Sequence, residues 1–343
     1  MTLAAEPASP PVHPELGDQD WSAVIGVISS AVRVVLCAHV SPDGDALGSA
    51  LALGLALRRM GVDVVVSHDT VPFRTPPSLM FLPGQDLLVR PDSINPGVDV
   101  VVAFDTGSRD RLGSLEHLID GARAMIVVDH HVTNTRFGTH NLIDVTAAST
   151  TVMVTRLLDA MGVELDSEIA TCLYTGLVTD TGSFKYAATT PEVHLLAARL
   201  LAAGIRHDLI ARSVYDSATF GYVQLLGDVL SRVQLDAELG LVWTTITSED
   251  LARYALSLDE VEGVIDVVRM TVEAEVAAVI KQDPTGAWKV STRSKGAVDV
   301  GQLCVSLGGG GHTFAAGYTS AYGPEQTLAQ LREALRAVLA DSE

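Results

Sequence analysis

Cysteine, long apolar segments and positive charge are all scarce in this 343-residue chain. The three cysteines, Cys37, Cys172 and Cys304, are odd in number and far apart, which argues against a disulfide framework or a zinc knuckle and is typical of a reducing cytosol. No segment stays apolar for the length that a membrane helix needs, and the first residues do not resemble a signal peptide. These absences predict a cytoplasmic protein with no membrane partner.

The charge balance limits the partners further. The chain carries 23 basic and 42 acidic residues, for a net charge of −19. A protein that grips long nucleic acid needs a basic surface that releases counterions from the phosphates. We therefore expect no long nucleic acid as a partner. Any nucleotide that the chain binds should be short, with its charge neutralised by bound metal ions and a few Arg and Lys side chains.

The order of apolar runs and helical periods predicts an α/β protein. In the first half, runs at 34–38, 98–104 and 124–128 are apolar enough for strands buried on both faces of a parallel sheet. After 235, strands and helices mix in a smaller α/β domain. We expect the substrate site in a cleft between the two domains. The predicted boundaries are a disordered tail at 1–20, a catalytic domain at 21–216, a connecting helix or linker at 217–234 and the second domain at 235–343.

Acidic and histidine side chains follow the predicted strands in chain order. The carboxyl ends of parallel strands meet at one edge of a sheet, and charged side chains are not buried without partners. A cation site is therefore expected at this edge, and hard oxygen donors with some imidazole suit Mn²⁺ better than Zn²⁺ or Ca²⁺. The residues are His39, Asp43 and Asp45 after the first run, Asp105 after the second, Asp129, His130 and His131 after the third, and Asp180 further on.

Each of these residues has a plainer explanation when taken alone. Asp43 and Asp45 fit an Asx turn at the end of a strand, and Asp105 fits the N-cap of a following helix. Asp180 fits a turn that ends a helix, and a lone histidine is usually a hydrogen-bonded structural residue. The arrangement of all of them in series favours the metal site.

A glycine run and a short basic segment mark the second half. Gly308–Gly311 closes on His312 inside a domain, so a flexible linker is not expected, and no Lys-Ser/Thr pair follows to make a phosphate-binding P-loop. Glycine lets backbone N–H groups approach an anion or a base closely. Arg293-Ser294-Lys295 precedes this run, and its two cations stand out in an acidic chain.

These motifs together resemble those of the DHH phosphoesterases that carry a DHHA1 domain. The similarity is carried by His39-Val40-Ser41-Pro42-Asp43-Gly44-Asp45, Asp129-His130-His131 and Gly308-Gly309-Gly310-Gly311-His312, and extends from about residue 24 to about residue 340. Within the superfamily the chain is similar to the short bacterial branch. That branch contains the oligoribonuclease/phosphoadenosine-phosphate phosphatases and the phosphodiesterases of cyclic di-AMP and linear dinucleotides.

The resemblance implies roles for individual residues. One cation is held by His39, Asp43 and Asp105, and the other by Asp45, Asp105, His130 and Asp180, so Asp105 bridges them. Asp129 and His131 orient His130 or touch the phosphate. Two Mn²⁺ ions are expected, with Mg²⁺ or Co²⁺ as alternatives, in a homodimer. The residues expected to hold the substrate are Arg293, Ser294, Lys295, Gly309, Gly310, Gly311 and His312, with Arg109 on the catalytic side, where a surface ion pair is the alternative.

The expected activity is hydrolysis of short nucleotides to mononucleotides by two-metal activation of water. The candidate substrates are linear dinucleotides such as pApA, short oligoribonucleotides, cyclic di-AMP and 3′-phosphoadenosine 5′-phosphate. Three alternatives stay open: a nucleotide-binding regulator without catalysis, a single-strand DNA exonuclease and a pyrophosphatase of the same superfamily. The regulator would require the loss of metal ligands, and none is missing from the series above.

Overall fold

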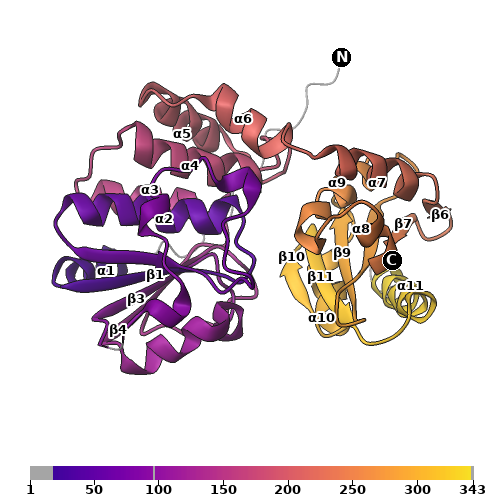
Figure 1. The fold of residues 1–343 in the computed structure, drawn as a ribbon, viewed down its shortest axis with the longest axis horizontal. Coiled ribbons are helices and arrows are strands. Elements are labelled where there is room, and N and C mark those ends of the chain that lie inside the picture. Colours follow the sequence, from indigo (N-terminus) through magenta and orange to yellow (C-terminus); the bar gives the residue numbers. More distant parts are fainter. Residues whose placement is uncertain (1–17, 96, 341–343) are drawn as a thin grey trace, which may run out of the picture. The chain divides into compact units, whose positions relative to one another are not determined.

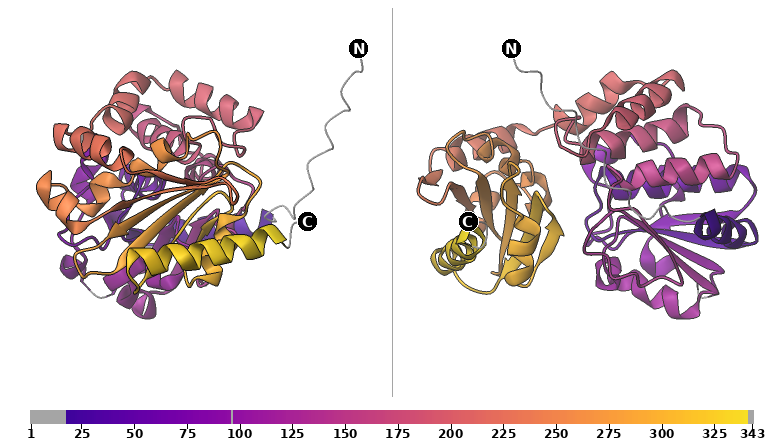
Figure 2. Two further views of the ribbon diagram at one scale, coloured as in Figure 1. Left: turned by 90° about the vertical axis from the view of Figure 1, so that its right-hand side faces the viewer. Right: turned by 180° about the vertical axis from the view of Figure 1, so that it is seen from behind.

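A computed structural model describes residues 18–95 and 97–340 of the chain. They form two compact units, which we describe separately (Figures 1 and 2). Of the described residues, the first unit contains 18–95, 97–130 and 134–214, and the second contains 131–133 and 215–340. The predicted tail lies outside the described residues as far as residue 17. Its last three residues already belong to helix α1 (Asp18–Ser29). No helix in the described ranges is both long enough and apolar enough to cross a bilayer.

The first unit contains a parallel five-stranded sheet, which confirms the predicted α/β class. The sheet order is β2-β1-β3-β4-β5, and every neighbouring pair is parallel. The strand β5 was not predicted, because its four residues carry no apolar run. The strands are β1 (Arg33–Ala38), β2 (Asp63–Ser67), β3 (Val100–Phe104), β4 (Ala124–Asp129) and β5 (His140–Ile143).

Alternate residues of the strands supply two separate apolar layers. Leu36 and Phe104 point into a core shared with helices α2, α3 and α4, whereas Val35 and Val101 point into a second core on the other face, shared with the 3₁₀ segment η4. Figure 1 shows α2 and α3 along one face of this sheet. The helical elements are α2 (Gly44–Arg59), η1 (Pro77–Leu79), η2 (Gln85–Leu87), η3 (Pro91–Ser93), η4 (Arg109–Gly121), α3 (Thr150–Ala160), α4 (Ser167–Asp180), α5 (Pro191–Ala202) and α6 (His207–Tyr215).

The second unit contains a mixed six-stranded sheet of order β10-β11-β9-β8-β7-β6, in which β7 and β8 are parallel and the other pairs antiparallel. Helices α10 and α11 pack on one face, and α7, α8 and α9 on the other. The elements are α7 (Phe220–Leu230), β6 (Gln234–Asp236), β7 (Leu241–Ile246), α8 (Ser248–Arg253), η5 (Leu258–Val261), α9 (Val264–Val268), β8 (Val276–Gln282), β9 (Trp288–Ser294), α10 (Val300–Ser306), β10 (Gly310–His312), β11 (Ala315–Ser320) and α11 (Pro324–Ala340).

Helix α7 lies within the connecting helix or linker expected at 217–234. Its residues Leu225 and Val229 are fully buried in the core that also contains Val242 and Ile246 of β7. These two residues are four apart, so they share one face of the helix. That apolar face packs α7 against the second sheet.

Candidate metal centre

The first two acidic residues lie where β1 gives way to α2. Asp43 is the N-cap of α2, and its Oδ1 accepts hydrogen bonds from the backbone N–H groups of Asp45 and Ala46, both at 3.0 Å. This satisfies two of the amides that a helix start leaves unpaired. The other oxygen, Oδ2, lies 3.9 Å from His39 Nε2. Asp43 therefore serves the fold with one oxygen while the other faces the site.

The two oxygens of Asp105 face different partners. Asp105 Oδ2 lies 3.6 Å from His39 Nε2, and Oδ1 lies 3.4 Å from His130 Nε2. Asp105 follows β3 directly with a φ of 54°, a left-handed conformation that is uncommon outside glycine and clusters at functional sites. The expected alternative, a helix N-cap, does not apply, because η4 begins only at Arg109, after Ser108.

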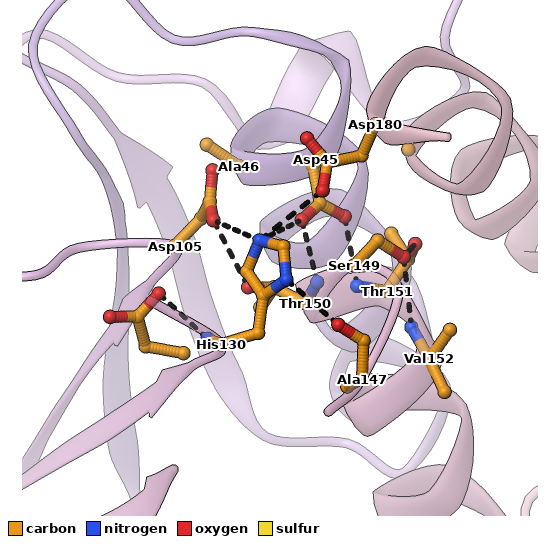
Figure 3. A network of polar contacts seen from close by, with 12 residues as sticks. Asp45, Ala46, Asp105, His130, Ala147, Ser149, Thr150, Thr151, Val152 and Asp180 are labelled. Atoms are coloured by element: carbon orange, nitrogen blue, oxygen red, sulfur yellow. Dashed lines mark hydrogen bonds and ion pairs between the residues drawn. The ribbon is translucent and has the colours of Figure 1, made fainter. Parts of the chain in front are cut away.

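His130 faces three carboxylates with one ring nitrogen and a carbonyl with the other (Figure 3). Its Nδ1 lies 3.0 Å from the carbonyl oxygen of Ala147, which can only accept, so Nδ1 carries a proton. Its Nε2 lies 3.2 Å from Asp180 Oδ2 and 3.9 Å from Asp45 Oδ2, in addition to Asp105. In metal-binding histidines, a hydrogen bond from the ring nitrogen that does not bind the metal commonly fixes the orientation of the ring.

His39 shows the same arrangement at the neighbouring position. Its Nδ1 lies 2.8 Å from the carbonyl oxygen of Val40, and the guanidinium of Arg111 is 3.3 Å from the same nitrogen. Because the carbonyl contact is shorter and a carbonyl cannot donate, we place the proton on Nδ1. Nε2 then faces Asp43 and Asp105. Burial alone would lower the pKa of His39, but the hydrogen bond to Asp105 and the charges of Asp43 and Asp105 raise it.

Asp45 is fully buried and holds the start of another helix. Its Oδ2 accepts from the backbone N–H of Thr150 at 2.6 Å, and its Oδ1 accepts from that of Thr151 at 2.9 Å. These amides belong to the first turn of α3, where an anion is favourable. Asp180 is the last residue of α4. Three helices and three strand ends thus converge on one cluster.

Asp45, Asp180 and His130 have raised pKa values, because they are buried next to negatively charged carboxylates. Burial, and then the charge of Asp105, raise the pKa of Asp45 to about 7. Burial also raises the pKa of Asp180 well above its usual value. Burial alone would lower the pKa of His130, but the hydrogen bond to Asp105 and the charges of Asp180, Asp105 and Asp45 raise it well above the usual value. Positive charge is therefore strongly favoured among these carboxylates.

The donor atoms form two groups that share Asp105. His39, Asp43 and Asp105 offer ligand atoms within 4.8 Å of one another, and so do Asp45, Asp105 and His130. Buried carboxylates need compensating charge, and carboxylate with imidazole is a donor set that suits divalent first-row metals. One carboxylate shared by two donor groups is the arrangement that a pair of divalent ions requires. The residues fit the predicted metal pair.

These pKa shifts predict how cation binding depends on pH. A divalent cation must displace the proton of Asp45, whose pKa is about 7. Mn²⁺ should therefore bind more weakly as the pH falls from 8 to 6, with a net release of protons on binding. In the metal-free protein, a carboxyl group whose pKa is raised by folding contributes stability that is lost as the pH rises toward 7. The rise in Tm caused by Mn²⁺ should accordingly grow between pH 5 and pH 8, which differential scanning calorimetry measures.

Asp45→Asn is the control, because it removes the titrating carboxyl group and keeps the side chain's size. This variant should lose most of the pH dependence of the Mn²⁺-induced shift. A shift in the unaltered protein that stays constant from pH 5 to pH 8 would contradict the assignment of Asp45 to cation binding.

Asp129 contacts the backbone of His130 and the side chain of Asn134. Asp129 is fully buried, and its Oδ1 accepts from the backbone N–H of His130 at 2.8 Å, while Oδ2 accepts from Asn134 Nδ2 at 2.5 Å. Asn134 also donates to the carbonyl of Thr106 at 3.0 Å. The carboxylate thus holds the His130 backbone. His131 follows directly and is half-buried.

Arg109 forms ion pairs within its own segment. Its guanidinium pairs with Glu116 at 2.7 Å and with Asp120 at 3.0 Å, both within η4. These ion pairs match the alternative considered for Arg109, and its contact with substrate stays a prediction.

Arg293 and His312 lie on one face of the second sheet. Ala315 of β11 is paired with Arg293 of β9 on one side and with His312 of β10 on the other. Directly opposed residues of antiparallel strands point to the same face, so both side chains flank Ala315. The pairing brings together two predicted substrate residues that are 19 positions apart in sequence.

The glycine run is a structured strand edge. Gly310 lies within β10, and a Cβ at Gly309 would come within 2.1 Å of the carbonyl oxygen of Gly317. A Cβ at Gly311, where φ is 142°, would come within 2.6 Å of the carbonyl oxygen of Ala315. These glycines therefore allow β10 to approach β11 closely. The expectation that the run is not a flexible linker is confirmed.

The other two residues of the basic segment have partners within the second unit. Ser294 is fully buried, and its hydroxyl donates to Glu275 Oε1 at 2.9 Å. The same oxygen accepts from the N–H groups of Lys295 at 3.0 Å and Ala297 at 2.8 Å. The ammonium group of Lys295 donates to the carbonyl of Thr271. Glu275 thus holds the turn that follows Arg293.

Sequence does not reveal the roles of three further groups at the site, including Asn134, for which a contact with ribose or base is the expectation. The carbonyl of Ala147, the hydroxyl of Thr150 and the amide of Asn134 all act on predicted metal-site residues. Ser149 and Thr150 are residue types that favour helix N-caps, and Ser149 is the N-cap of α3. A capping signal does not reveal that the neighbouring hydroxyl points to a carboxylate 45 residues earlier.

Two family models match most of the chain. Residues 33–177 match the model of the DHH family, N-terminal domain, and residues 249–341 match that of the DHHA1 domain. The chain belongs to the DHH family.

Several individual proteins are similar along most of their length. The chain is 37% identical to the bifunctional oligoribonuclease and PAP phosphatase NrnA of Thermus thermophilus, over 83% of each chain. It is 27% identical to the protein of the same name from Bacillus subtilis, over 86% of this chain and 91% of the relative. The crystal structure of an exopolyphosphatase-related protein from Bacteroides fragilis superimposes with a TM-score of 0.86 at 25% identity, covering 95% of this chain and 98% of that one.

Proposed function

We propose that this protein is a metal-dependent phosphodiesterase that hydrolyses short oligoribonucleotides and linear dinucleotides such as pApA to mononucleotides. We also propose phosphatase activity toward 3′-phosphoadenosine 5′-phosphate, and cyclic di-AMP is a further candidate substrate. The similarity to proteins named oligoribonuclease and PAP phosphatase supports the substrate class. A cyclic di-AMP phosphodiesterase, GdpP of Geobacillus thermodenitrificans, is 27% identical over 90% of this chain and 48% of its own length.

The main support for this proposal is that the two oxygens of Asp105 face different histidines. One oxygen faces His39 and the other faces His130, and the carboxylate is 4% exposed. A carboxylate placed in this way suits a pair of cations, which lower the pKa of water and neutralise charge on a phosphate. We propose Mn²⁺ for both, with Mg²⁺ or Co²⁺ as alternatives.

The protein's own groups would then divide the work. His39, Asp43 and Asp105 would hold one cation, and Asp45, Asp105, His130 and Asp180 the other. The contacts of Nδ1 with the carbonyls of Ala147 and Val40 would hold the rings of His130 and His39 so that Nε2 can bind a cation once its proton is released. His131 would contact the scissile phosphate, and Arg293, Lys295, His312 and the glycine run Gly309–Gly311 would bind the part of the substrate that does not react.

The remaining proposals concern the whole molecule. The acidic composition supports small substrates and no long nucleic acid. We propose that the protein is a homodimer of the cytoplasm, without a membrane partner. We further propose that it is divided into a catalytic domain up to about residue 214 and a substrate-binding domain from about residue 215, with α7 in the second.

A regulator without catalysis is the rival from another class. Such a protein would lack one or more cation ligands, whereas all six proposed ligands are present in the sequence of this chain. A metal-dependent turnover assay separates the two. Turnover of pApA that depends on Mn²⁺ supports the enzyme, and tight nucleotide binding without turnover supports the regulator.

Substrate length provides the sharpest test of the proposed substrate class. The net charge of −19 opposes a long polyanion, so the rate per 3′ or 5′ end should fall at least about tenfold between a dinucleotide and a forty-residue RNA. Rates are measured with end-labelled RNA of 2, 5, 10 and 40 residues under Mn²⁺ at constant ionic strength. Equal rates per end at both extremes would place the protein among the exonucleases of long strands.

A further inference from the structure

One threonine at the start of α3 contacts two of the proposed metal ligands. The backbone N–H of Thr150 donates to Asp45 Oδ2 at 2.6 Å, and its hydroxyl donates to Asp105 Oδ1 at 3.2 Å. Thr150 is fully buried. Figure 3 shows it beside Asp45, Asp105 and His130. A single residue therefore touches a carboxylate of the second donor group and the carboxylate that both groups share.

The orientation of Asp105 is the feature that this hydroxyl can determine. The carboxylate of an aspartate rotates over a broad range about its last torsion. Asp105 can serve two cations only while Oδ2 faces His39 and Oδ1 faces His130. A donor on Oδ1 occupies one of its two lone pairs and leaves the other free toward His130. The hydroxyl thus holds the carboxylate plane in the one orientation that suits a shared ligand.

The contact of the Thr150 hydroxyl with Asp105 is not a by-product of helix capping, because another residue caps α3. Ser149 is the N-cap of α3 and accepts from the N–H of Val152. One turn further on, the hydroxyl of Thr155 donates to the carbonyl of Thr151, which is the ordinary arrangement for a threonine within a helix. Thr150 instead directs its hydroxyl out of the helix, to a strand end 45 residues earlier.

We propose that Thr150 is a positioning residue that orients the shared carboxylate of Asp105 and so makes the paired metal site possible. This inference rests on the proposed metal-dependent function. Groups that orient metal ligands typically contribute about 10- to 100-fold to metal affinity or activity. Thr150→Val keeps the shape and removes the hydroxyl, and it should weaken the binding of one of two Mn²⁺ ions by that factor. Thr150→Ser restores the hydroxyl and should bind both ions as the unaltered protein does.

The experiment measures metal binding directly. Isothermal titration of the full-length, metal-free protein with Mn²⁺ gives the number of ions and their affinities, and electron paramagnetic resonance reports the coupling of two adjacent ions. Thr155→Val is the matched control, since it removes a buried hydroxyl from the same helix that bonds only to a backbone carbonyl. We expect two coupled ions in the unaltered protein, in Thr155→Val and in Thr150→Ser, and weakened coupling in Thr150→Val.

Each outcome bears on a separate conclusion. Thr150→Val that binds two coupled Mn²⁺ ions with unaltered affinity overturns the positioning role and leaves the proposed function standing. An unaltered protein that binds no Mn²⁺ and does not hydrolyse pApA overturns the proposed function itself. If Thr150→Val does not fold, as circular dichroism would reveal, Thr150→Ser and Thr150→Ala decide: weaker binding only in the alanine variant supports the role, and equal binding overturns it.

Discussion

Asp105→Asn is expected to abolish hydrolysis of pApA, with a loss of about a thousandfold or more. The shared carboxylate contacts both donor groups, and metal catalysis supplies several kcal/mol of charge stabilisation, each 1.4 kcal/mol being tenfold in rate. Asparagine has nearly the same shape and is, with aspartate, among the residues that best tolerate the positive φ found here. Turnover under saturating Mn²⁺ is compared with that of the unaltered protein.

Two further measurements separate lost chemistry from lost folding. The circular dichroism spectrum of Asp105→Asn should be unchanged, while the stabilisation by Mn²⁺ should shrink. Asp92→Asn is a suitable control, because Asp92 is exposed on η3 and pairs with Arg90. Near-normal turnover in folded Asp105→Asn would disprove the assignment of a shared ligand.

The second large effect is expected in the other unit. Arg293→Ala should lower kcat/KM for a dinucleotide by about 10- to 150-fold, since a charged hydrogen bond to phosphate contributes about 1.5–3 kcal/mol. The loss should fall mainly on KM, because the contact is made to a part of the substrate that does not react. p-Nitrophenyl phosphate has no distal group, so its hydrolysis should change little.

The acidic chain offers a matched control for this substitution. Arg336 is exposed on α11, which packs on the opposite face of the second sheet from Arg293. Arg336→Ala therefore makes the same change in net charge at a remote place, and both kinetic constants should be unaltered. If Arg293→Ala lowered the hydrolysis of both substrates equally, its action would be on the metal centre and not on distal recognition.

The apolar strands of the first unit could be predicted because their signal is local. The runs at 34–38 and 124–128 became β1 and β4 within a residue, since strands buried on both faces must be continuously apolar. The acidic residues at their ends could be placed at one edge by the same reasoning. Strands of three or four residues, such as β5 and β10, carry too little pattern to be recognised.

Long-range hydrogen bonds account for most of what could not be predicted. The bond from Thr150 to Asp105 spans 45 residues, and the bonds from α3 to Asp45 span more than a hundred. A capping pattern in sequence identifies the helix start but not the remote acceptor. The charge pattern alone does not distinguish the local ion pairs of Arg109 from a contact with phosphate, because both require only an arginine near this end of the sheet.

The double duty of Asp43 has a practical use in trapping a complex. Its Oδ1 caps α2, so its removal would damage the helix start as well as the cation site. Asparagine is as good an N-cap as aspartate but carries no charge for the cation. Asp43→Asn is therefore the substitution of choice for an intact, slow enzyme that retains bound nucleotide long enough for crystallisation. Asp43→Ala would confuse loss of chemistry with fraying of α2.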